Sequence, residues 1–221
     1  MVPDRLRLVN PTPVVARLAG QLAARGSGVI GGSDSTPLTW MLGADDDLAT
    51  TRASGIGERD RILVVSWIGA HPDARANVLG RLWRLEEQCR ASGLPTLTLR
   101  LGPLAGPGSP LWQKLAHTKP SPRLARRPVH PVLEMQVVEV IERASVGAIV
   151  WSGWQEIGGP DIMTLGECAE HARGARTAAE GEWEPDLEAL AEQRLIEPEV
   201  WARWSGIEPR SVRAEAATWA A

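Results

Sequence analysis

The stretch RILVVSWIG, residues 61–69, carries the strongest strand signal in the chain. A strand that is buried on both faces of a parallel sheet has this nearly continuous apolar composition. Residues 75–91 follow with the apolar spacing of an amphipathic helix, and GLPTLTLRLG, residues 93–102, returns as a strand. This alternation of strand and helix predicts an α/β fold, in which helices flank a Rossmann-like parallel sheet.

The same alternation continues toward the N-terminus. Residues 5–9 are expected to form a short strand, and residues 13–25 a helix that Gly26 stops. Further strands are expected at 29–30 and 37–42. Asp45, Asp46 and Asp47 then open a helix, where negative charge suits the positive end of the helix dipole, and we expect this first turn to be solvated.

Beyond residue 102 the pattern becomes mostly helical. Helices are expected at 111–117, 132–146 and 185–194, and a strand, a turn and a helix at 152–172. Thr164 and Glu167 have the spacing of a capping box. We therefore expect a shortened Rossmann-like core over residues 1–160. A small, mostly helical part over residues 161–221 would join it in one domain.

The composition excludes several function classes. The 221 residues are 43% hydrophobic with a net charge of -3, so neither a nucleic-acid partner nor a membrane span is expected. We expect a cytoplasmic protein. Cys89 and Cys168 fit no metal or redox spacing and are predicted to be buried free thiols, and the four histidines form no metal motif. The chain holds 10 Trp but no Tyr, so no reaction here can use a tyrosine as acid or base.

Several motifs together resemble one known family. RILVVSWIGAHPDA (61–74), ASGLPTLTLRLGPLAGPGSP (91–110) and EIGGPDIMTLGECAE (156–170) are similar to stretches of the atypical short-chain dehydrogenase/reductase superfamily, in its NmrA-like, NAD(P)H-binding branch. PVLEMQVVEVIERA (131–144) and GIEPRSVRAEAATWA (206–220) extend the likeness over most of the chain. The resemblance implies a dinucleotide-binding fold with a substrate crevice.

The chain departs from that family at the turn that binds the diphosphate. Where relatives carry G-x-x-G-x-x-G, this sequence places Asn10, Pro13 and Ala16 around Thr12. Pro11 and Pro13 each lack an N–H, so two phosphate donors are lost. The turn is therefore a degenerate cofactor site.

Two further departures concern the ribose and the chemistry. Between Gly26 and Arg61 the chain is too short for the strands and helices that relatives usually place there, and Asp34 is expected to be a turn residue. On the helix at 75–91, Val78 and Leu82 occupy the positions of the Tyr-x-x-x-Lys pair that many relatives use.

The remaining candidate residues lie at predicted strand ends, which point into the ligand crevice in such sheets. Ser66, Trp67, His71 and Arg100 are expected around one cavity with Gly102 and the loop over 102–108. His71 is either a general acid/base, which Asp73 would orient, or an ordinary loop histidine. Ser66 is expected to donate a hydrogen bond rather than act as a nucleophile. Trp67 either stacks on a flat ligand or fills the space of the nicotinamide.

Other polar and aromatic residues have weaker signals. Trp154 is expected to face the crevice, one residue from a strand end. Glu134 borders the substrate side in the family layout, and with His130 it would bind or polarise a ligand. Glu86 and Glu87 have the spacing of surface residues on their helix.

These features leave three functional hypotheses. In the first, the protein has lost NAD(P)H, needs no cofactor, and binds a small organic ligand, with non-redox chemistry of the cyclase or isomerase type. In the second, it is an NAD(P)H-dependent oxidoreductase with an unusual phosphate turn. In the third, it is a non-catalytic regulator or a partner subunit, acting as a homo-oligomer or on another protein.

Overall fold

Five parallel strands form the central sheet of the computed structural model, which describes residues 5–8, 11–26, 38–174 and 187–219. Their spatial order is β1 (Arg5–Arg7), β2 (Leu38–Leu42), β3 (Arg61–Trp67), β4 (Thr96–Leu101) and β8 (Gly153–Ile157). Every neighbouring pair is parallel, so the carboxyl ends of all five strands meet at one edge of the sheet. The predicted Rossmann-like α/β fold is confirmed.

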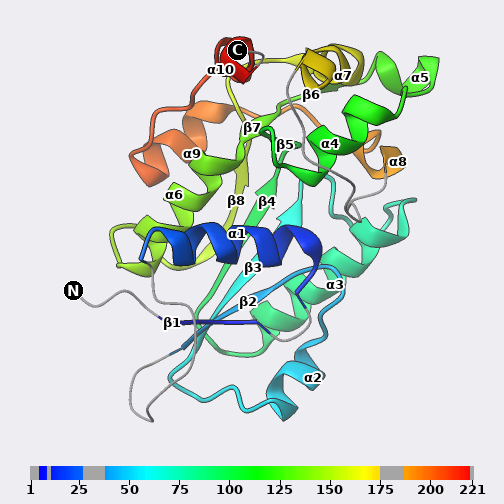
Figure 1. The fold of residues 1–221 in the computed structure, drawn as a ribbon. Helices are drawn as coiled ribbons and strands as arrows, with labels where there is room; N and C mark the ends of the chain where they lie inside the picture. The colour runs from blue at the N-terminus through cyan, green and yellow to red at the C-terminus, as the bar shows by residue number, and fades with distance from the viewer. Residues whose placement is uncertain (1–4, 9–10, 27–37, 175–186, 220–221) are drawn as a thin grey trace.

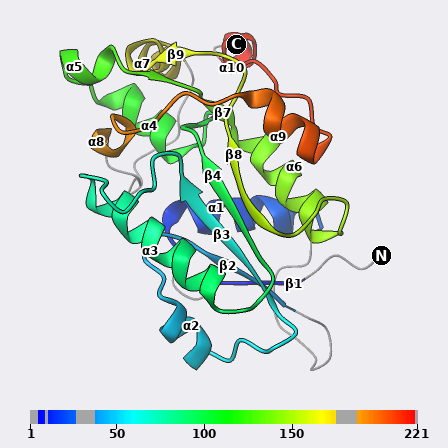
Figure 2. The same cartoon turned by 180° about the vertical axis from the view of Figure 1, so that it is seen from behind.

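Helices cover both faces of this sheet (Figures 1 and 2). On one face α1 (Pro13–Ala24) packs beside α6 (Glu134–Ser145). The other face is covered by α3 (Asn77–Ala91), next to the shorter α2 (Leu48–Ala53). The two layers explain why β3 is apolar along its whole length.

The side chains of β3 alternate between the two helical layers. Ile62 and Val64 pack with the α3 residues Leu85 and Cys89. Leu63, Val65 and Trp67 point the other way and belong to the main core, which also contains side chains of α1 and α6.

A second core lies beyond the carboxyl edge of the sheet, around the fully buried Trp112. It is built by α4 (Pro110–His117), α5 (Pro122–Ala125), α7 (Leu165–Gly174), α8 (Leu187–Leu190) and α10 (Val212–Trp219). Two short strand pairs tie these helices to the sheet. They are β5 (Leu104–Ala105) with β7 (Val132–Leu133), and β6 (Pro128–Val129) with β9 (Met163–Thr164). The predicted boundary at residue 160 falls between β8 and β9 and stays a prediction.

The predicted capping box at the start of α7 is confirmed. Glu167 Oε2 accepts the N–H of Thr164 at 2.7 Å, and Thr164 Oγ1 accepts the N–H of Glu167 at 3.2 Å. The hydrogen bond that the Glu167 carboxylate accepts from the Thr164 N–H lowers the pKa of that carboxyl.

Other local expectations need correction. Asp47 caps α2 as its sequence position suggests, but Asp46 is buried and its carboxylate accepts the N–H of Gly43 at 2.7 Å. The expected helix at 185–194 is reduced to the single turn α8 in the described residues, and α9 (Pro198–Ser205) was not expected. The expected strand at 29–30 and Asp34 lie outside the described residues. No helix in the described part of the chain is long and apolar enough to cross a membrane.

Candidate functional site

The turn before α1 offers a phosphate few hydrogen-bond donors. Asn10 lies outside the described residues, and Pro11 has no N–H. Thr12 is the N-cap of α1 and its Oγ1 accepts the N–H of Val15 at 3.4 Å, while Pro13 is the first helical residue. Pro13 lacks an N–H and Val15 donates its own to Thr12, so among residues 12–15 only the amides of Thr12 and Val14 are outside these arrangements.

Protein atoms also crowd this helix start. A side chain on Gly43, which follows β2, would place its Cβ 2.8 Å from Val15 Cγ2 and 3.2 Å from Thr12 Oγ1. The glycine therefore allows the chain after β2 to pack directly on the turn. The buried Asp46 carboxylate accepts the Gly43 N–H at this contact.

The order of the strands in the sheet also bears on where a dinucleotide could bind. In a doubly wound sheet the ligand lies where the strand order reverses, with strands on both sides of the first. In the described part of the chain β1 is an edge strand, and the spatial order follows the sequence order without a reversal. The described residues show no such reversal, although α1 and α2 leave the neighbouring strands β1 and β2 toward opposite faces of the sheet.

A pocket of about 270 Å³ lies at the carboxyl ends of the strands. Its wall comes from the loop after β3, from β4 and β8, and from the segment after α8. The lining residues are Gly69, Ala70, His71, Asp73, Ala74, Arg100, Glu156, Glu192 and Arg194. The structure thus brings two of the predicted residues, His71 and Arg100, to one pocket.

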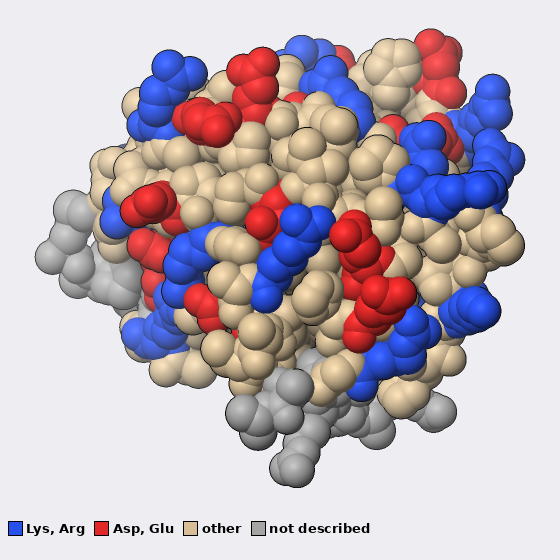
Figure 3. Space-filling model, turned by 90° about the horizontal axis from the view of Figure 1, so that it is seen from above, with Lys and Arg blue, Asp and Glu red and all other residues tan. Residues whose placement is uncertain are grey.

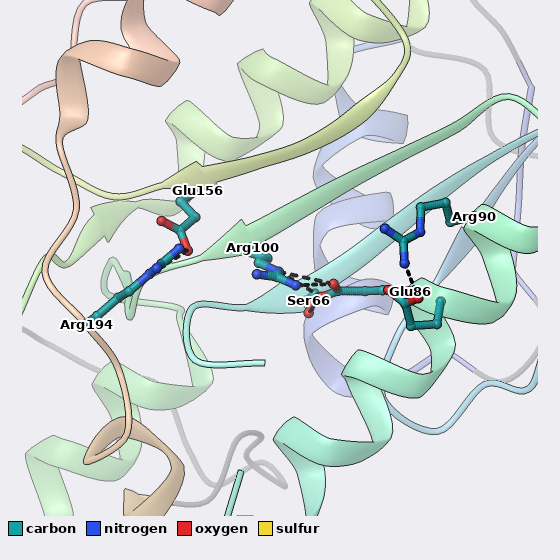
Figure 4. Close-up of polar contacts among 7 residues, drawn as sticks. Ser66, Glu86, Arg90, Arg100, Glu156 and Arg194 are labelled. Carbon is teal, nitrogen blue, oxygen red and sulfur yellow. Dashed lines mark hydrogen bonds and ion pairs between the residues drawn. The ribbon is translucent and has the colours of Figure 1, made fainter. Parts of the chain in front are cut away.

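Behind this pocket lies a buried polar cluster (Figure 4). Arg100 donates from Nε and a terminal nitrogen to both oxygens of Glu86, with the shortest contact at 2.6 Å. Ser66 Oγ donates to Glu86 Oε1 at 2.5 Å. Ser66 is fully buried, and the Glu86 and Arg100 side chains are 7% and 15% exposed.

The prediction that Glu86 lies on the surface is therefore wrong. Glu86 follows Val78 and Leu82 at intervals of four residues, so all three lie on one face of α3. The structure shows that this face points to the sheet, since all three are buried. This four-residue spacing could have predicted that Glu86 is buried, but the prediction considered only its charge.

The expected role of Ser66 as a hydrogen-bond donor agrees with its contact to Glu86. His71 lies elsewhere in the wall, with its side chain 64% exposed, and its Nδ1 accepts the N–H of Asp73 at 3.2 Å. The Asp73 carboxylate is 3.7 Å from the same nitrogen. Since Ser66 is already bonded to Glu86, the structure forms no serine–histidine pair of the hydrolase type.

Two other predicted ligand contacts have packing roles. Trp67 is only 3% exposed and sits in the main core, which favours the alternative that it fills space over the one in which it stacks on a ligand. Gly102 is pressed against the backbone, because a Cβ there would lie 2.2 Å from the carbonyl oxygen of His130. Its N–H donates to Ile157 O at 2.8 Å. Gly102 thus serves a close approach of two chain segments, which corrects its expected place in the ligand crevice.

Glu134 and His130 are both buried but bond to other groups. Arg17 Nε donates to Glu134 Oε1 at 2.5 Å, and His130 Nδ1 lies 2.9 Å from Gly159 O. Arg17 and Glu134 line a separate pocket of about 200 Å³ between α1 and the loop after β5.

A segment that sequence reasoning missed closes the main pocket. The Glu192 carboxylate accepts the N–H groups of Arg75 and Ala76 at 2.9 and 2.7 Å, where α3 has no side-chain cap of its own. Two residues later, Arg194 donates to Glu156 Oε1 at 2.7 Å. We call residues 192–197 the strap. Its contacts are remote in sequence, so only the acidic composition of 185–194 was visible beforehand.

On the other side of the Glu156–Arg194 ion pair lies a wide groove of about 640 Å³. The predicted Trp154 forms its apolar wall with its ring half exposed, and the Arg100 guanidinium lies 4.8 Å from the centre of that ring. The groove is lined by Trp154, Gln155, Glu156, Arg194, Leu195, Ile196, Glu197 and Val200. The main pocket and the groove therefore share Glu156 and Arg194.

Neither cysteine takes part in these sites. Cys89 and Cys168 are buried free thiols, as predicted, and burial raises the pKa of each to about 12. In the described residues no group of three or more His, Cys, Asp or Glu side chains could hold a metal ion.

Comparison with known proteins supports the fold. No protein-family model and no curated protein sequence matches the chain. Among solved structures, it is similar to the Bordetella bronchiseptica enzyme WbmG in complex with NAD, with a TM-score of 0.64 and 12% identity over 99% of this chain and 94% of that one. RMD from Pseudomonas aeruginosa complexed with NADPH matches with a TM-score of 0.61 and 14% identity, over 99% and 98% of the two chains.

A third similar structure is the UDP-glucose 4-epimerase of Thermotoga maritima with UDP-glucose. It has a TM-score of 0.59 and 14% identity over 98% of this chain and 97% of that one. At such low identity these likenesses concern the fold alone, and the NmrA-like branch stays a prediction. The chain therefore has a Rossmann-like fold similar to that of these three proteins.

Proposed function

We propose that this protein has lost dinucleotide binding and uses the main pocket to bind a small organic ligand. The observation that carries the proposal is the start of α1, where prolines and the Thr12 cap remove amide donors and Gly43 packs on the turn. The solved structures that resemble the chain contain NAD or NADPH, so the fold alone leaves dinucleotide binding open. The details of the turn argue against it.

The energetic argument rests on the missing donors. A hydrogen bond to a charged group contributes roughly 1.5–3 kcal/mol. The loss of two such bonds at Pro11 and Pro13 would weaken binding by about two to four powers of ten, because each 1.4 kcal/mol is tenfold. Packing of Gly43 on the turn adds to this loss.

The sizes of the two smaller pockets support the same proposal. Pockets for cofactors and drug-sized ligands usually measure about 300–1,000 Å³. The main pocket and the pocket beside Arg17 measure about 270 and 200 Å³, below that range, and the groove of about 640 Å³ next to the main pocket leaves room for the body of an organic ligand. His71 lines the main pocket, and an imidazole can both donate and accept a proton, so we assign any non-redox proton transfer to this residue.

Titration with NADPH tests the loss of the cofactor. Ten tryptophans make energy transfer from indole to the reduced nicotinamide a direct readout, and calorimetry provides a second one. The wild-type chain is expected to show no saturable binding at micromolar NADPH. The triple change of Asn10, Pro13 and Ala16 to Gly is expected to raise the affinity, because Pro13→Gly restores one amide donor and the three glycines open the turn.

A matched control is Ala23→Gly, at an exposed position near the end of the same helix. It lowers helix propensity without touching the turn. Tight NADPH binding by the wild-type chain would refute the proposal and favour the oxidoreductase hypothesis. If the triple variant binds NADPH no better than the Ala23→Gly control, the account of the turn is wrong.

A further inference from the structure

We propose that the ligand of this site is a small protonated amine on a flat apolar body, held by Glu156 and Trp154. This inference rests on the proposed function and specifies the chemical class of its ligand. The ammonium would bind the free oxygen of Glu156, between the main pocket and the groove. The apolar body would lie along the groove against the Trp154 ring.

The first argument for a cationic ligand is the charge of the residues that line the main pocket and the groove. Four acidic residues, Asp73, Glu156, Glu192 and Glu197, and two arginines, Arg100 and Arg194, line them, and the Glu192 carboxylate also accepts two backbone N–H groups before α3. Arg100 is already neutralised, because it makes a two-oxygen contact with the buried Glu86 behind the wall. The site therefore has an excess of negative charge, which attracts a cation and repels an anion.

The local geometry of Glu156 identifies the binding atom. Both hydrogen bonds from Arg194 go to Oε1, at 2.7 and 3.1 Å. Oε2 has no hydrogen-bond partner among the residues that the structure describes, although the side chain is only 15% exposed. An ammonium has three donors, so it can bond to Oε2 without breaking the contact to Oε1.

Arg194 is a weak competitor for the same carboxylate. Its side chain is 60% exposed, and exposed ion pairs of this kind contribute little to stability. Figure 4 shows Arg194 reaching Glu156 from the strap, while Arg100, the neighbour of Glu156 on the adjacent strand, turns the other way toward Glu86. A ligand cation can thus share or replace the guanidinium without disturbing the core.

The apolar half of the ligand follows from the groove. Trp154, Leu195 and Val200 each expose about half of their surface there, at 50%, 47% and 47%. Large apolar side chains gathered in a groove, with a carboxylate at one end, fit an amphipathic cation. Trp154 adds an aromatic face that attracts cations and stacks on flat rings.

Calorimetry with a matched pair of probes tests the ligand class on the full chain. Tryptamine and indole-3-propionate share the same ring and a two-carbon arm but carry opposite charges. Tryptamine is expected to bind with one-to-one stoichiometry, and indole-3-propionate is expected to show no saturable binding in the same range. Glu156→Gln should weaken tryptamine binding about ten- to a hundredfold, the usual range for losing a charged hydrogen-bond acceptor.

The direction in which Arg194→Gln, at an exposed side chain, changes the affinity for tryptamine distinguishes a cation site from an anion site. If the site selects cations, removing this guanidinium should strengthen tryptamine binding by about two- to fivefold. Trp154→Leu should weaken it, and Glu170→Gln, at an exposed site on α7, controls for the change in total charge. Thermal melting of each variant checks that the fold is kept.

Two results would overturn the amine proposal. One is binding of indole-3-propionate that Arg194→Gln abolishes, which would make Arg194 an anion receptor. The other is the absence of binding by either probe. Both leave the loss of dinucleotide binding intact, because that claim fails only if the wild-type chain binds NADPH.

Discussion

Removing the buried partner of Arg100 should destabilise the protein strongly. Glu86 receives hydrogen bonds from Arg100 and from Ser66, and its side chain is 7% exposed. Glu86→Ala would leave the guanidinium without its counter-ion and the Ser66 hydroxyl without its acceptor. Both groups would remain in a largely dehydrated place between α3 and the sheet.

The expected loss can be worked from these contacts. Removing one member of a buried ion pair costs about 3–5 kcal/mol. Arg100 lines the pocket and its side chain is 15% exposed, so we expect the cost of Glu86→Ala to lie near the lower end of that range. We therefore expect a loss of about 3 kcal/mol in the free energy of unfolding. For a chain of 221 residues this corresponds to a fall in Tm of roughly 6–12 °C. Arg100→Ala should cost about as much or more, because Glu86 is the more deeply buried partner.

Chemical denaturation of single and combined variants measures the coupling between the partners. The combination of Ser66→Ala, Glu86→Leu and Arg100→Met removes every member of the cluster and fills the space with apolar atoms. Because no charge or hydroxyl is then left unpaired, this variant should recover most of the lost stability. Far-UV circular dichroism at each denaturant concentration provides the unfolding curve.

The reasoning fails under either of two outcomes. A loss below about 1 kcal/mol for Glu86→Ala would mean that water reaches the cluster in solution, as it does for surface ion pairs. A combined variant less stable than Glu86→Ala alone would mean that the polar groups stabilise the fold by themselves.

Three other predictions concern packing, capping and titration. Gly102→Ala should lower the free energy of unfolding by about 2 kcal/mol or more in denaturant melts, because the new Cβ would lie 2.2 Å from a backbone carbonyl oxygen. Gly20→Ala is the control: Gly20 has open space around it in α1, so this change should stabilise the protein by about 0.5–1 kcal/mol. Glu192→Gln should speed amide hydrogen exchange in the strap and at the start of α3, since the cap of that helix is weakened by about 1 kcal/mol. Burial raises the pKa of Cys89 and Cys168 from 9.0 to about 12, so stability should fall as the pH rises from about 9 toward 12, where the unfolded chain releases protons that the folded chain keeps. A double change of both cysteines to Ala should flatten that fall, and an equal slope in both proteins would contradict the assignment.

The surface at the carboxyl edge of the sheet agrees with a site for a small ligand. Figure 3 views the molecule from above, and acidic and basic side chains are interspersed over that face. No large field of one sign is visible among the described residues drawn there. Local charge at Glu156 and Arg194 then decides selectivity, so the sign of the Arg194→Gln effect is more informative than the net charge of -3.

Much of the fold was predictable because its signals are local. The mostly apolar run at 61–67 favours a strand covered on both faces, and Thr164 with Glu167 had the spacing of the cap that forms. Pro13 likewise starts α1 as its fixed backbone angle requires. Each of these features depends on residues within about one helical turn or one strand.

The candidate site depended on contacts between distant segments. Glu86 looks like a surface residue beside Glu87 until α3 is placed against the sheet and Arg100 becomes its partner. The strap closes the pocket through Glu192 and Arg194, which bond to residues 116 and 38 positions away. Helical spacing and propensity act over a few residues, so the sequence pattern could establish the strands, the caps and the loss of amide donors at Pro11 and Pro13. Which charges are buried, paired or left free is settled only when the chain packs, because desolvation and pairing depend on neighbours that sequence distance does not reveal.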